Sequence, residues 1–179
     1  MSIFLLIISI LAWLVALVML PSRPLYSPAL SSLGLVGMSL CKTDGLAWVP
    51  ISNSMLISWL TITVVVMMAT FLQPAVIKSQ TRGMGYMIGG AIVGLAIGLL
   101  GYTMTSVIST MYAIMMLGVV VGIFFGFLMY SNTPDGSDVR MSSGNFFKYL
   151  FAKGFPTAVT VMQIGVVLVI LIAVSDLSK

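Results

Sequence analysis

Long runs without charge constrain this chain more than any other feature. Residues 83–134 contain no Asp, Glu, Lys or Arg, and the same is true of residues 1–22, 45–77 and 154–175. As one helix, residues 83–134 would extend about 78 Å at 1.5 Å per residue, whereas the hydrocarbon core of a bilayer is only about 30 Å thick. This run therefore predicts two membrane spans joined by a turn, which we place in the hydroxyl-rich residues 102–106.

Together the uncharged runs predict an all-α, polytopic transmembrane helical bundle. We expect a single integral membrane domain over residues 1–179, because the spans leave no room for a separate soluble domain. Residues 25–41 are short for a span and rich in serine, so a bundle of five spans is the alternative to six. The expected spans are residues 3–20, 25–41, 54–73, 84–102, 107–130 and 156–175, with residues 131–155 as a cytoplasmic loop.

The distribution of cations favours the six-span arrangement. Lys and Arg accumulate in short cytoplasmic loops of membrane proteins. If residues 25–41 span the membrane, six of the eight cations share one side, whereas five do so if this segment does not span. We therefore expect both termini outside and six cations on the cytoplasmic side, namely Arg23, Lys78, Arg82, Arg140, Lys148 and Lys153.

Glycine spacing marks the fourth and fifth predicted spans. Residues four apart lie on one face of a helix, and glycine there lets a neighbouring backbone approach closely. The pattern predicts a glycine-zipper hairpin between these two spans. The alternative is a helix-packing face for another copy of the chain or for another membrane protein. The glycines concerned are Gly90, Gly94 and Gly98 in the fourth span and Gly118, Gly122 and Gly126 in the fifth.

Gln163 is the most informative polar residue inside a predicted span. A primary amide among Val, Met and Ile side chains needs a partner within the protein. We expect a hydrogen bond between helices, and contact with a substrate is the alternative. No Asp, Glu, Lys, Arg or His falls well inside any predicted span, which argues against an ion-coupled pump.

The segment from Asn145 to Lys153 combines aromatic residues with two lysines. This composition is typical of a short interfacial helix, with rings at headgroup level and cations toward anionic lipid. We therefore expect Lys148 and Lys153 to face the membrane surface, and a helix that docks a partner protein is the alternative.

Residues that carry enzyme chemistry are missing from the sequence. The chain has no His, no Glu and one Cys, so no catalytic residues, metal ligands or cofactor-binding residues are predicted, and we do not expect an enzyme. Eight scattered cations also argue against nucleic acid binding.

The function that best fits these features is that of a non-catalytic subunit or scaffold of a membrane protein complex. Expected partners are the lipid bilayer and other membrane protein subunits, or further copies of the chain. The alternative is a small transporter or channel for an uncharged or weakly polar solute. Because no targeting segment is visible, we expect a multi-pass protein of a bacterial inner membrane.

Overall fold

The computed structural model describes residues 2–43, 46–47, 51–100 and 108–177 of the chain. Within these residues, six helices of 14 to 24 residues form most of the structure. They are α1 (Ser2–Met19), α2 (Ser27–Leu40), α3 (Asn53–Phe71), α5 (Met84–Leu100), α6 (Ile108–Ser131) and α8 (Phe155–Leu177). The shorter elements are strands β1 (Lys42–Thr43) and β2 (Leu46–Ala47), helix α4 (Ala75–Ser79), the 3-10 helix η2 (Pro134–Val139), helix α7 (Asn145–Tyr149) and the π-helical turn η3 (Leu150–Gly154).

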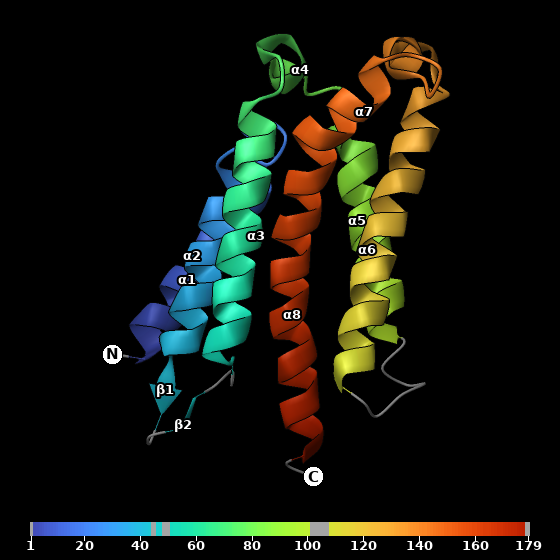
Figure 1. The fold of residues 1–179 in the computed structure, drawn as a ribbon. Coiled ribbons are helices and arrows are strands. Elements are labelled where there is room, and N and C mark those ends of the chain that lie inside the picture. Colours follow the sequence, from blue (N-terminus) through green and yellow to red (C-terminus); the bar gives the residue numbers. More distant parts are fainter. Residues whose placement is uncertain (1, 44–45, 48–50, 101–107, 178–179) are drawn as a thin grey trace.

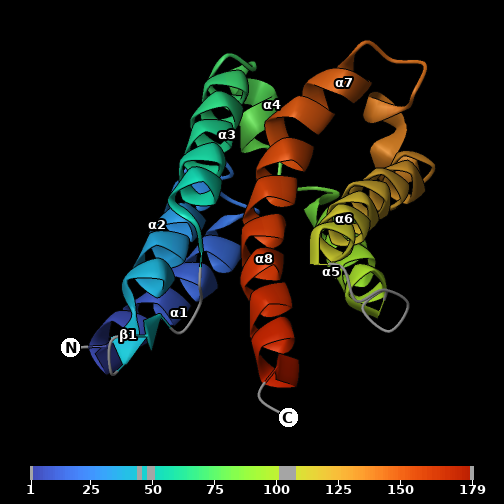
Figure 2. The same cartoon turned by 60° about the horizontal axis from the view of Figure 1, so that its bottom comes forward.

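Successive long helices run in opposite directions, so both chain ends lie at the same end of the bundle (Figure 1). Helix α8 runs between two groups of helices, with α1, α2 and α3 on one side and the hairpin of α5 and α6 on the other (Figures 1 and 2). In the helical segment Asn145–Ala173, which contains most of α8, 72% of the most apolar 18 residues are buried. The corresponding share for α3 is 17%. Helix α8 is therefore the centre of the bundle, whereas α3 is largely exposed.

Local sequence signals fix several helix ends. Ser52 caps α3, because its side chain accepts a hydrogen bond from the backbone N–H of Met55. Pro74 follows the end of α3 and begins the short turn of α4. Gly83 has a φ of +82° just before α5, a backbone conformation that residues with a side chain rarely adopt.

The end of the bundle opposite the chain termini collects most of the cations. We call it the cation-rich end; it comprises residues 20–26, 72–83 and 132–154, which lie together in Figure 1. Hydrogen bonds connect these loops, since the Lys153 ammonium donates to the carbonyls of Pro21 and Lys78. Lys42 lies in β1, at the opposite end.

The prediction of a helical fold with several long apolar helices is confirmed. Apart from the two-residue strands, the regular elements of the described residues are helical. Within the described part of the chain, three helices are long and apolar enough to cross a membrane: Asn53–Phe71, Ser109–Ser131 and Asn145–Ala173. Residues 27–40, in the segment that separates six spans from five, form a helix that packs along α1. The turn predicted at residues 102–106 lies outside the described residues.

Candidate functional site

Gln163 joins three helices inside the bundle. Its side chain is fully buried on α8, where it faces α2 and α3. The amide Nε2 donates to Ser32 Oγ at 3.0 Å and to Thr63 Oγ1 at 2.9 Å, and the amide oxygen accepts from Ser31 Oγ. Both ends of the amide are therefore used in hydrogen bonds between helices.

Two threonines extend this polar contact along α8 toward the cation-rich end. Thr160 Oγ1 lies 3.1 Å from Ser27 Oγ. Because the Ser27 hydroxyl donates to the Ala16 carbonyl at 2.7 Å, it accepts from Thr160. Thr157, one turn nearer that end, donates to the Lys153 carbonyl at 2.7 Å. Among the described residues, no buried side-chain nitrogen or oxygen lacks a hydrogen-bond partner.

Lys153 has no exposed surface, although it lies at the end of the bundle. Its ammonium donates to the Lys78 carbonyl at 2.7 Å and lies 3.4 Å from the Pro21 carbonyl, so one side chain joins the π-helical turn to helix α4 and to the loop after α1. The expectation that Lys153 faces anionic lipid is therefore wrong, whereas Lys148 is exposed. Lys153 lies in the π-helical turn, where the extra residue per turn shifts which side chains face inward.

The six glycines singled out from the sequence lie at the interface between α5 and α6. A Cβ atom added to Gly90 would overlap the carbonyl oxygen of Gly122, and one added to Gly94 would overlap that of Gly118. At Gly98 it would lie 2.6 Å from Met115 Cα, and at Gly126 it would overlap the carbonyl of Tyr86. The backbone of each helix thus fills the space that a side chain on the other would need. By contrast, a Cβ atom added to Gly85 or Gly89 of α5 would have nothing within 4 Å.

An apolar groove of about 500 Å³ runs along the outside of this hairpin. Glycines of both helices form its floor, and its walls are exposed apolar side chains. The main wall residues are Val93 and Ile97 of α5 and Val121, Phe125 and Met129 of α6. The groove therefore presents an almost wholly apolar surface.

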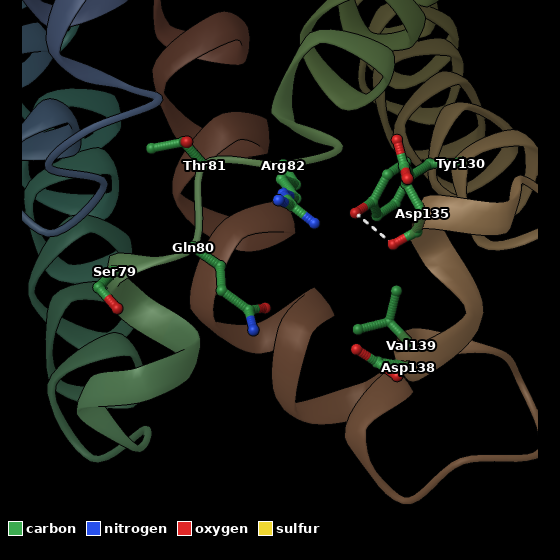
Figure 3. Close-up of a pocket in the computed structure, with 8 residues that line it drawn as sticks. All are labelled: Ser79, Gln80, Thr81, Arg82, Tyr130, Asp135, Asp138 and Val139. Carbon is green, nitrogen blue, oxygen red and sulfur yellow. Dashed lines mark hydrogen bonds between the residues drawn. The ribbon is translucent and has the colours of Figure 1, made fainter.

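A polar pocket of about 340 Å³ lies at the cation-rich end of the same hairpin (Figure 3). Its walls come from the loop before α5 and from η2, which follows α6. Arg82 and Gln80 border it on one side, and Asp135 and Asp138 border it on the other. All four side chains are exposed to solvent, so they are free to contact a ligand.

Tyr130 forms the inner wall of this pocket. Its hydroxyl donates to the backbone carbonyl of Asp135 at 3.2 Å, and its ring lies against Gly83, where an added Cβ would have no room. The Tyr130 ring also contacts the ring of Tyr86, with centroids 5.8 Å apart. Because Tyr86 lines the apolar groove, this pair of rings stands between the groove and the polar pocket.

No protein-family model, curated protein or solved structure is similar to this chain.

Proposed function

We propose that this chain is a multi-pass, non-catalytic subunit or scaffold of a membrane protein complex, located in a bacterial inner membrane. In this proposal all six long helices cross the bilayer, and the cation-rich end faces the cytoplasm. The observation that carries the proposal is the exposed face of helix α3.

Helix α3 carries a stripe of small hydroxyl residues on its exposed side. Of its 19 residues, only Trp59, Thr63 and Thr70 are buried. Ser54, Ser58 and Thr61 are exposed. With 3.6 residues per turn they lie on the opposite side of the helix from the buried residues. Small residues and hydroxyls are typical of contacts between transmembrane helices, because they let two backbones approach.

The spacing of this stripe is that of a packing seam. After Thr61 it continues through Val65 and Met68, which are 60% and 66% exposed. The positions 54, 58, 61, 65 and 68 alternate steps of four and three residues, the repeat by which two helices interlock. Among the described residues, the hydroxyls of Ser58 and Thr61 bond only to carbonyls one turn back, at 2.8 and 2.9 Å. A transmembrane helix of another protein is the partner that this surface fits.

The polar contact around Gln163 supports a structural role rather than transport. The polar groups around the Gln163 amide are Thr63, Thr160 and the serines of α2. They form hydrogen bonds with the amide, with one another or with backbone carbonyls. A site for a weakly polar solute needs polar groups that are available to the solute, usually near the bilayer midplane where helices break. The candidate transporter function therefore has less support than the scaffold.

Copurification tests the proposal. Ser58→Phe and Thr61→Phe add bulk to the α3 stripe, and we expect both variants to lose a membrane protein that copurifies with the native chain in mild detergent. Val18→Phe is the matched control, because Val18 is 78% exposed on α1. A pure, monodisperse native monomer that moves a solute across liposomes by itself would overturn the scaffold and favour the transporter.

Cysteine labelling tests the orientation independently. In a Cys41→Ser background, Ser137→Cys places a thiol in η2 at the cation-rich end, and Thr43→Cys places one in β1 at the other end. We expect an impermeant thiol reagent added to intact cells to label the second and not the first. Labelling at position 137 from outside would reverse the proposed orientation.

A further inference from the structure

We propose that the α5–α6 hairpin binds one phospholipid whose headgroup carries both a primary ammonium and a phosphate. The headgroup lies in the polar pocket of Figure 3, and an acyl chain lies in the apolar groove along the glycines. This inference requires only that the hairpin is embedded in a membrane, and it is independent of any partner at α3.

The pocket separates opposite charges in the way that a zwitterion requires. The Arg82 guanidinium can bind a phosphate through two parallel N–H groups, and the Gln80 amide beside it adds a further donor. Across the pocket, Asp135 and Asp138 offer carboxylates to an ammonium. Within the part of the chain that the structure describes, no ion pair joins Arg82 to either carboxylate. The charges are therefore available to a ligand rather than neutralised by each other.

The balance of charge argues against a purely anionic ligand. One arginine faces two aspartates, so the pocket carries more negative than positive charge. A phosphate without an ammonium would bind Arg82 while lying near two uncompensated carboxylates. The volume of about 340 Å³ is at the lower end of the range for small-molecule sites, which suits a headgroup rather than a large polar molecule.

The groove has the length of an acyl chain in one leaflet. Its lining on α5 runs from Tyr86 to Ile97, which corresponds to about 16 Å at 1.5 Å per residue. Half of a hydrocarbon core is about 15 Å. The groove begins where the polar pocket ends, at the Tyr86–Tyr130 ring pair. A polar end and an apolar channel of one-leaflet length thus meet on a single hairpin.

Lipid binding to the purified full-length chain tests the headgroup site. The chain is stripped of lipid in detergent and titrated, by native mass spectrometry, with phosphatidylethanolamine, phosphatidylcholine and phosphatidylglycerol of identical acyl chains. We expect phosphatidylethanolamine to bind about tenfold more tightly than the other two, because only its ammonium donates N–H bonds to the aspartates. Equal binding of all three lipids would overturn the proposal.

Matched variants assign the site. Arg82→Gln and the double variant Asp135→Asn, Asp138→Asn should each weaken phosphatidylethanolamine binding about tenfold. Arg140→Gln should leave it unchanged, since Arg140 is exposed at the same end and does not line the pocket. Unchanged binding in the Arg82 and aspartate variants would overturn the assignment.

The groove is tested by filling it. Val93 and Ile92 are neighbours on α5 with similar exposure, 58% and 53%, and only Val93 lines the groove. We expect Val93→Phe to weaken binding of the lipid and Ile92→Phe to leave it unchanged. Soluble glycerophosphoethanolamine, which has no acyl chain, should bind much more weakly than the lipid. If it binds as tightly, or if Val93→Phe releases a copurifying protein instead of lipid, the groove does not hold an acyl chain.

Discussion

Helix α8 and the α5–α6 hairpin bring helices together by different means. Where α8 meets α2 and α3, side chains reach across the interface, and the Gln163 amide bonds to three hydroxyls at once. Where α5 meets α6, side chains are absent at the closest points, and backbone lies on backbone at Gly94 and Gly118. In lipid, where burial of apolar surface gives no advantage, both means are available to hold helices together.

The two interfaces should differ in how they tolerate change. A side-chain hydrogen bond can be lost while its partners find other bonds, whereas a glycine contact leaves no space for any larger residue. Stability measurements on matched variants test this difference, and the hairpin should be the more sensitive region.

The largest effect is expected for Gly94→Leu. An added side chain at this position meets the backbone of Gly118 rather than a flexible side chain, so one helix must move. We expect a loss of about 3 kcal/mol in the free energy of unfolding, measured by denaturant titration of the purified protein in detergent. Gly89→Leu is the control, because an added Cβ there has nothing within 4 Å. Equal stability of the two variants would mean that α5 and α6 do not pack through these glycines.

A smaller loss is expected for Lys153→Met. The substitution keeps an apolar stem of similar length but removes the donor to the Lys78 and Pro21 carbonyls. Removing the ammonium also removes the cost of burying a charge, which offsets part of the loss. We expect a net destabilisation of about 2 kcal/mol, since a partly buried carbonyl would lose its donor. Lys148→Met, at an exposed position, should change stability by less than about 0.5 kcal/mol. A more stable Lys153→Met protein would show that the charge costs more than its hydrogen bonds return.

How far the sequence predicts these regions depends on the range of the interactions involved. Uncharged runs and glycine spacing are local patterns, so the helical membrane class and the position of the glycine-rich helices could be read from them. The cap at Ser52 is also a local feature, because the serine side chain bonds to a backbone N–H only three residues further along the chain. The inward position of Lys153 depends on a π-helical turn, for which its neighbours in the sequence give no signal.

The polar pocket was missed for a related reason. Its two sides, around Arg82 and around Asp135, are far apart in the sequence, and the hairpin brings them to one end. A signal was present, because residues just before and just after a predicted antiparallel hairpin must lie at the same end of it. The cation count uses Arg82 only as an indicator of topology and does not consider Asp135 and Asp138 on the other side of the hairpin.

The smallest effect is expected for Gln163→Leu, although this residue is the most connected polar group in the bundle. Without the amide, the Ser32 and Thr63 hydroxyl oxygens lie 2.9 Å apart, so that one hydroxyl donates to the other, and the Ser31 hydroxyl donates to the Pro28 carbonyl, 3.0 Å away. The partners therefore remain satisfied, and leucine fills most of the space of the amide. We expect a destabilisation of about 1 kcal/mol, within the range measured for hydrogen bonds between transmembrane helices. A double-mutant cycle with Ser31→Ala isolates the contribution of the amide oxygen, with a coupling energy of about 1 kcal/mol or less. A loss from Gln163→Leu as large as that from Gly94→Leu would show that the polar interface, and not the hairpin, is the less tolerant region. It would also mean that the hydroxyls of α2 and α3 cannot satisfy one another without the amide.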